Sequence, residues 1–298
     1  MNRRRLLVGL GGLVGVTAFG ATGLELVARG VLPGKQVLDQ LDGACSVPAP
    51  RVALAAAGPV QTGTFYSRAR RRRVAYSIAY PAGHRPGDEL PLIVWLHAFG
   101  GSHTSMPARL LSMRPRGRPL PPMAMAAADG GGLYWNPHPG DDPMGMVIDE
   151  LIPMCQRLGL GRPGPAGQRR IGTSGISMGG YGAILLAEKH PDLIGAVAAI
   201  APAIWTTYQQ ARSVNPGAYA SAAAFARADA VTHASALANV AVRVASGVDD
   251  PFHPGVEALV RELPPGAVVD IGPGCHTGAF FAQQEPPSVE FLGQRLNG

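Results

Sequence analysis

The sequence predicts an α/β fold in which a mostly parallel central sheet is covered by helices on both faces. Segments with strand character and segments with helix character alternate through most of residues 73–298, which is typical of parallel strands joined by crossover helices. Several strand segments are continuous apolar runs, as expected for strands buried on both faces. Hydrophobic residues make up 46% of the 298 residues, enough for a sizeable core.

The individual elements follow from the spacing of their apolar residues. Residues 144–160 predict an amphipathic helix that closes near Gly159, and residues 178–190 predict a helix stopped by Pro191. The alanine-rich stretch 206–238 predicts a small helical insertion after the strand that follows this second helix. The expected strand segments are 63–67, 73–81, 90–98, 123–130, 169–177, 193–203, 239–247 and 266–274.

Basic residues cluster in two places. Arg3 to Arg5 lie near the N-terminus, and Arg70 to Arg73 separate the first two strand segments, where we interpret them as a solvated hairpin turn. The formal net charge of +6 is therefore not arranged as a stripe interleaved with aromatic residues. We expect no nucleic-acid partner.

The stretch GISMGGYG, which begins at Gly175, contains Ser177 in a Gly-x-Ser-x-Gly pattern. The chain has 40 glycines, so the pattern alone is weak evidence and its context decides. Ser177 falls where a predicted strand ends and a predicted helix begins, as a nucleophile elbow requires. The glycines permit a sharp turn, and the helix points its N-terminal amides toward the place where negative charge develops during acyl transfer.

A serine needs a general base and an acid that orients it, and here the expected chain order is Ser, then Asp or Glu, then His. His276 is the last of eight histidines and follows the last strand segment. Asp249 and Asp250 follow the strand segment before it. Both positions lie at carboxyl ends of parallel strands, where sites assemble in open α/β sheets. We expect Ser177, Asp250 and His276 to form a catalytic triad, with Asp249 as the alternative acid.

An oxyanion hole requires two backbone N–H groups. One is expected from Met178, directly after the serine, and the other from Phe99, in the loop HAFGGSH that follows the strand segment 90–98. Tyr134 and Trp135 lie in a glycine-rich loop. They are either partly buried aromatic residues or the wall of a pocket for the acyl or alcohol group.

The sequence resembles the esterase branch of the α/β hydrolases, which includes esterase D, feruloyl esterases and the secreted mycolyltransferases. The resemblance covers roughly residues 58–296 and rests on WLHAFGGSH, DGGGLYWNPHPGDDPMGMVIDELIP, GISMGGYGAILLAEKHPDLIGAVAAIAP, SGVDDPFHP and GCHTGAFF. In that family the acid follows a Gly-x-x-Asp step, which corresponds to Gly247 and Asp250. Ala98 departs from the pattern, since glycine is commoner there, but its methyl group removes no N–H.

Together these features predict a serine esterase acting on a small-molecule or lipid ester, with no cofactor and no metal. The alternative that the resemblance implies is an acyltransferase that moves an acyl chain to a sugar or lipid hydroxyl in the cell envelope. A third reading, a non-catalytic envelope-binding protein, is disfavoured because no triad member is missing.

The N-terminus has the features of a targeting segment. Arg3 and Arg4 precede an apolar, uncharged run from Leu6 to Leu24, which resembles a twin-arginine export signal. We expect residues 1–24 to be a signal peptide or an N-terminal membrane anchor, residues 25–57 a linker, and residues 58–298 the catalytic domain. The protein is thus expected outside the cytoplasm, secreted or attached to the membrane.

Of the three cysteines, Cys155 lies at helical spacing with apolar residues and reads as a buried thiol. Export allows disulfide formation, which leaves Cys45 and Cys275 as the expected pair. The alternative is that both remain free thiols.

Overall fold

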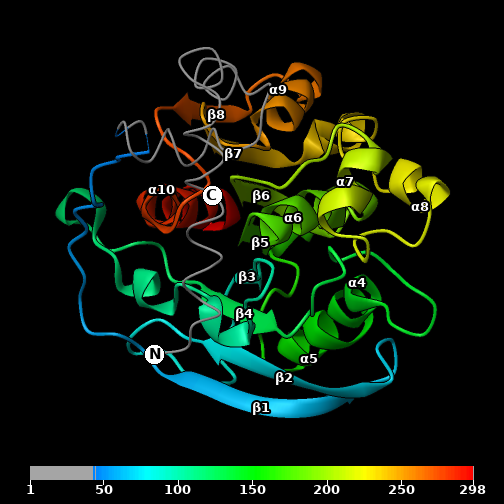
Figure 1. The fold of residues 1–298 in the computed structure, drawn as a ribbon. Coiled ribbons are helices and arrows are strands. Elements are labelled where there is room, and N and C mark those ends of the chain that lie inside the picture. Colours follow the sequence, from blue (N-terminus) through cyan, green and yellow to red (C-terminus); the bar gives the residue numbers. More distant parts are fainter. Residues whose placement is uncertain (1–42, 44, 298) are drawn as a thin grey trace, which may run out of the picture.

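The computed structural model describes residue 43 and residues 45–297, and it contains one eight-stranded sheet in the order β1-β2-β4-β3-β5-β6-β7-β8 (Figure 1). The first two strands form an antiparallel hairpin and β2 pairs antiparallel with β4, whereas every later pairing is parallel. The predicted mostly parallel sheet is therefore confirmed. The strands are β1 (Val60–Ser67), β2 (Arg72–Ala79), β3 (Leu92–Leu96), β4 (Ala124–Ala128), β5 (Ile171–Ile176), β6 (Ile194–Ile200), β7 (Ala241–Gly247) and β8 (Val268–Gly272).

Helices cover both faces of the sheet, with α10 on one side and α4, α5 and α6 on the other (Figure 1). The helix α6 packs on β3, β5 and β6, and α10 packs on β5, β6 and β7. Two separate apolar cores result, one under each layer of helices. The helices are α4 (Pro143–Met146), α5 (Ile152–Arg157), α6 (Met178–Lys189), α7 (Tyr208–Val214), α8 (Ala222–Arg227), α9 (His253–Glu262) and α10 (Gly278–Asn297).

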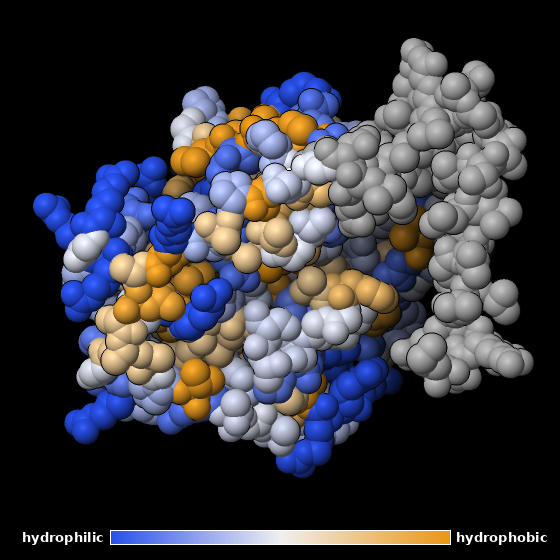
Figure 2. Space-filling model, turned by 60° about the vertical axis from the view of Figure 1, so that its left-hand side comes forward, coloured by the Kyte–Doolittle hydropathy of each residue, from blue (hydrophilic) through white to orange (hydrophobic). Residues whose placement is uncertain are grey.

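The central strands β3 and β4 are apolar along their whole length and buried on both faces. All five residues of β3 and all five of β4 are buried, in agreement with the continuous apolar runs in the sequence. The face of the molecule in Figure 2 is mixed, with strongly hydrophilic residues separating smaller hydrophobic patches. The buried apolar residues form two clusters that hold the helices against the sheet.

The helix expected over 144–160 is interrupted. Between α4 and α5 the backbone makes one wider π-helical turn, Val147–Leu151, just before Pro153. Proline has no N–H to donate to the carbonyl four residues earlier and its ring crowds that carbonyl, so a wider turn relieves the conflict. The insertion between β6 and β7 consists of α7, α8 and a short 3-10 helix, Ala234–Asn239, as expected.

The interpretation of Arg70 as part of a solvated turn is wrong. The Arg70 side chain is only 4% exposed and forms an ion pair with Asp141, whose Oδ1 lies 2.7 Å from Arg70 Nε. Glu150 holds the same turn from the helix side, because its carboxylate accepts hydrogen bonds from the N–H groups of Arg68 and Ala69. Arg72, in contrast, remains more than half exposed.

The expected export segment, residues 1–24, lies outside the described residues, as does most of the expected linker. Within the part of the chain that the structure describes, no helix is both long enough and apolar enough to cross a membrane.

Candidate active site

Ser177 lies on a sharp turn between β5 and α6, with backbone angles φ 57° and ψ −119°. A positive φ is unusual for a residue with a side chain, and such strain concentrates at functional sites. The turn is held by backbone hydrogen bonds, since Ser177 N–H donates to Ile200 O at 2.9 Å and Ser177 O accepts from Ala203 N–H at 3.0 Å. The strand–turn–helix context that the sequence predicted is therefore present.

Two glycines are required around this turn because the backbones of β3 and α6 touch. A Cβ atom on Gly175 would lie 2.4 Å from Leu96 O, and one on Gly179 would lie 1.8 Å from the same oxygen. Only glycine permits this approach. The contact also brings the loop after β3, which carries Phe99, next to the first turn of α6.

His276 connects the serine to an aspartate. Its Nε2 lies 2.8 Å from Ser177 Oγ, and its Nδ1 lies 2.7 Å from Asp250 Oδ2. The Asp250 side chain is fully buried, and its other oxygen accepts the N–H of Phe252 at 2.8 Å. The structure thus brings together Ser177, His276 and Asp250, and the aspartate in contact with the imidazole is Asp250.

Two phenylalanines flank the imidazole of His276. Phe252 and Phe281 present edge contacts, with ring centroids 5.1 Å and 4.9 Å from that of His276. Sequence reasoning did not single out either residue. The signal was nonetheless present, since Phe252 lies two residues after Asp250 and Phe281 closes the stretch GCHTGAFF.

The backbone N–H groups of Phe99 and Met178 are the expected oxyanion donors. Among the described residues, neither group donates a backbone hydrogen bond within the chain. The Phe99 ring is 63% exposed, and a Cβ atom on Gly132 would lie 2.9 Å from it, so this ring lies over the glycine-rich loop after β4.

Tyr134 and Trp135 are both buried, at 5% and 1% exposure. Trp135 packs on His97, with ring centroids 5.0 Å apart, and its Nε1 donates to His97 O at 3.3 Å. Tyr134 belongs to an aromatic series that reaches His276, because its ring lies 6.3 Å from that of Trp205, which in turn contacts Phe252. The contacts of Trp135 are those of a supporting residue, and Tyr134 packs among other aromatic rings.

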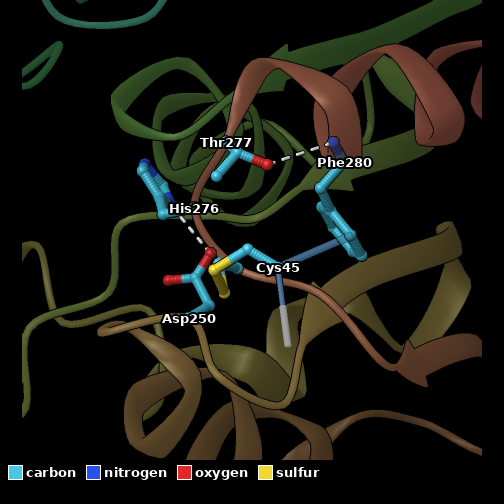
Figure 3. The surroundings of a disulfide bond; sticks show 6 residues. Cys45, Asp250, His276, Thr277 and Phe280 are labelled. Carbon is cyan, nitrogen blue, oxygen red and sulfur yellow. Dashed lines mark hydrogen bonds and ion pairs between the residues drawn. A yellow bond between two sulfur atoms is a disulfide. The ribbon is translucent and has the colours of Figure 1, made fainter. Parts of the chain in front are cut away.

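The expected disulfide between Cys45 and Cys275 is present, with Cα atoms 4.9 Å apart, and Cys155 is a buried free thiol. Figure 3 shows the bridge beside His276 and Asp250. It joins the segment before β1 to the loop that carries the imidazole.

The sheet order and the strand-end position of the serine, histidine and aspartate are those of the α/β-hydrolase fold. Comparisons with known proteins agree. The family model described as "Putative esterase" matches residues 150–257. No curated protein matches the chain. The family-model match agrees with the esterase resemblance seen in the sequence.

Solved structures with this fold include a ferulic acid esterase, with a TM-score of 0.66 and 17% identity, covering 80% of this chain and 99% of that one. The fluorophosphonate-binding serine hydrolase FphF of Staphylococcus aureus has a TM-score of 0.63 and 14% identity over 80% and 99% of the two chains. An S-formylglutathione hydrolase from Agrobacterium tumefaciens has a TM-score of 0.61 and 17% identity over 84% and 100%.

Proposed function

We propose that the protein is an exported serine esterase in which Ser177 is the nucleophile, His276 the general base and acid, and Asp250 the residue that orients the imidazole. The observation that carries the proposal is the continuous hydrogen-bonded series from Ser177 Oγ through His276 to buried Asp250. The strained turn at Ser177 supports it independently, because such strain concentrates at functional sites.

The chemistry follows from these positions. Ser177 Oγ attacks the ester carbonyl carbon while its proton passes to His276 Nε2, and Asp250 stabilises the imidazolium through Nδ1–H. The negative charge on the carbonyl oxygen is taken up by the N–H groups of Phe99 and Met178. When the tetrahedral intermediate collapses, the C–O bond to the alcohol breaks and the alcohol oxygen takes the proton from His276. Water then repeats the sequence on the acyl-enzyme and frees the acid.

The substrate is proposed to be a small-molecule ester with an apolar or aromatic group beside the serine. Exposed Phe99 and the series Phe252, Trp205 and Tyr134 would contact that group. The names of two structural neighbours, a ferulic acid esterase and an S-formylglutathione hydrolase, agree with small esters or thioesters as the first compounds to test.

A fluorophosphonate probe tests the nucleophile. It should label the wild-type protein and leave Ser177→Ala unlabelled, and equal labelling of the two would refute the assignment. The reaction class is tested with p-nitrophenyl esters of increasing chain length, with and without a sugar acceptor. Free acid as the product supports the esterase, whereas an acylated sugar would identify the acyltransferase alternative.

Export is proposed from the arginine pair and apolar run in residues 1–24, and the disulfide is consistent with it, because such bonds persist in oxidising compartments. The same apolar run would attach an uncleaved form to the membrane.

A further inference from the structure

Arg70, at the turn between β1 and β2, directs its guanidinium toward the loop after β4. Two of its nitrogens bind the Asp141 carboxylate, Nε to Oδ1 at 2.7 Å and Nη2 to Oδ2 at 3.1 Å. Its third nitrogen, Nη1, donates to the backbone oxygen of Asp129. A guanidinium fixed by a two-point ion pair at 4% exposure is held rigidly against that carbonyl.

The carbonyl that Arg70 binds belongs to the Asp129–Gly130 peptide. The N–H of the same peptide, on Gly130, donates to His97 Nε2 at 2.8 Å. Because the C=O and N–H of a trans peptide point in opposite directions, Arg70 and His97 lie at its two ends. A Cβ atom on Gly130 would lie 2.3 Å from the Trp135 ring, so this peptide is closely packed as well.

His97 links this peptide to a second one through the two nitrogens of its ring. Its side chain is 1% exposed, and its Nδ1 lies 2.8 Å from Ala98 O. Since Nε2 accepts a hydrogen bond from Gly130, Nδ1 must carry the ring proton and donate it to Ala98 O. Burial lowers the pKa of His97, which favours the neutral imidazole that this tautomer requires.

The Ala98 carbonyl shares its peptide with the N–H of Phe99. The two peptides and the imidazole therefore form one head-to-tail series: guanidinium to Asp129 O, Gly130 N–H to Nε2, Nδ1–H to Ala98 O, and finally Phe99 N–H. Gly101 N–H, at 2.9 Å, also holds Ala98 O. In such a series each hydrogen bond polarises the next, by roughly 10–30% per bond.

We propose that Arg70 is a positioning residue that orients and polarises the Phe99 N–H for the oxyanion, acting through the Asp129–Gly130 peptide and His97. The proposal rests on the proposed function, in which Phe99 N–H is an oxyanion donor. Arg70 itself touches no reacting atom. Its charge would strengthen the terminal donor at the moment when negative charge forms on the substrate.

The test compares Arg70→Met with Arg72→Met as the matched control. Arg72 Nη2 binds the same Asp141 carboxylate at 2.7 Å, but Arg72 contacts neither peptide of the series. We expect Arg70→Met to lower kcat by roughly tenfold to a hundredfold, less than the loss of a whole oxyanion donor, with KM within about twofold. Arg72→Met should keep kcat within about twofold.

The inhibition constant of a trifluoromethyl ketone is a measurement that a purely structural role of Arg70 would leave unchanged. Ser177 adds to its carbonyl and forms a tetrahedral oxyanion, so its inhibition constant should rise in Arg70→Met by the same factor by which kcat/KM falls. Assays are run well below the melting temperature of each variant. Unchanged kcat and inhibition constant in a less stable Arg70→Met would overturn the proposal, and so would an equal loss in Arg72→Met.

If Arg70→Met does not fold, Arg70→Lys replaces it in the same assays. Its ammonium keeps the charge but not the two-point ion pair, so we expect a smaller loss of kcat under the same criteria. Fluorophosphonate labelling of Arg70→Met separates the two hypotheses. If Arg70→Met is labelled at Ser177 and keeps full kcat, the role of Arg70 is refuted and the proposed function stands. If wild type and Ser177→Ala are labelled equally, the proposed function itself is refuted.

Discussion

Ser177 Oγ and His276 Nε2 lie 2.8 Å apart although 99 residues separate them in the chain. The sheet creates this contact. Ser177 follows β5, Asp250 follows β7 and the imidazole follows β8, and all three strands run parallel, so their carboxyl ends share one edge. The geometry of the site is therefore set by strand order rather than by any local motif.

The first prediction concerns the acid. Asp250→Asn should lower kcat by about 10⁴, because an amide cannot stabilise the imidazolium or hold the required tautomer. The measurement is turnover of a p-nitrophenyl ester at saturating concentration. Asp249→Asn is the neighbouring control and should lose far less activity. A larger loss at Asp249 would reverse the assignment.

The disulfide should support catalysis as well as stability. Cys275 directly precedes His276, and its bridge to Cys45 spans 230 residues of sequence, for which the chain-entropy model gives an upper value of about 5 kcal/mol. Reduction should lower kcat by roughly tenfold before the domain unfolds, because a small displacement of a catalytic group costs that much or more.

Activity and unfolding are followed together as the concentration of dithiothreitol increases. Cys45→Ser is the control, and its activity should already be low and should not respond to the reductant. If reduced and oxidised wild type have equal kcat, the bridge has no catalytic role. Free, alkylated Cys45 and Cys275 in the non-reduced protein would rule out the bridge itself.

Glu188 should make stability fall as the pH rises. Its side chain is 6% exposed, both carboxylate oxygens are buried without a hydrogen-bond partner among the described residues, and burial raises its pKa to about 9. A folded-state pKa above the unfolded value means that the full stability is present below about pH 4.5. That stability is lost progressively toward pH 9, by up to about 1.4 kcal/mol per pH unit.

Glu188→Gln, a neutral residue of the same shape, should therefore flatten the dependence of the unfolding free energy on pH between about 5 and 9. Urea denaturation at several pH values measures it. Glu262→Gln, at an exposed position on α9, is the control and should keep the wild-type slope. Parallel slopes for wild type and Glu188→Gln would show that Glu188 does not titrate in this range.

The export route is tested at the arginine pair. Changing Arg3 and Arg4 to Lys should trap the protein in the cytoplasm, because a twin-arginine signal is read by its receptor as arginines and not as charge alone. Fractionation of cells measures it, with Arg5→Lys as the control. Normal export of the double variant would refute the route, although not export itself.

The sequence was sufficient for the elements and for the elbow because these depend on local patterns. Apolar runs predicted β3 and β4, and glycines on both sides of a serine predicted the turn at Ser177. The choice between Asp249 and Asp250 rested only on the Gly-x-x-Asp spacing from Gly247. The orientation of the loop after β7 decides which of the two carboxylates contacts His276. The disulfide followed from elimination among only three cysteines.

The burial of Arg70 was beyond such reasoning. Four consecutive arginines are typical of a solvated turn, and of these four only Arg70 is buried, paired with Asp141, 71 residues later in the chain. The π-helical turn before Pro153 was missed because helical spacing hides a change of one residue in the hydrogen-bonding pattern. The first difference is set by a tertiary contact, and the second by a local one between Pro153 and the carbonyl four residues earlier.

The insertion between β6 and β7 carries no member of the Ser177–Asp250–His276 set, yet it borders the aromatic residues beside it. Tyr219 packs against Tyr134 at 6.1 Å, and Asn215 Nδ2 donates to Gly132 O at 3.4 Å. We therefore expect an exchange of this insertion to change which esters are accepted, through Trp205 and the packing on Tyr134, while the contacts among Ser177, His276 and Asp250 are kept.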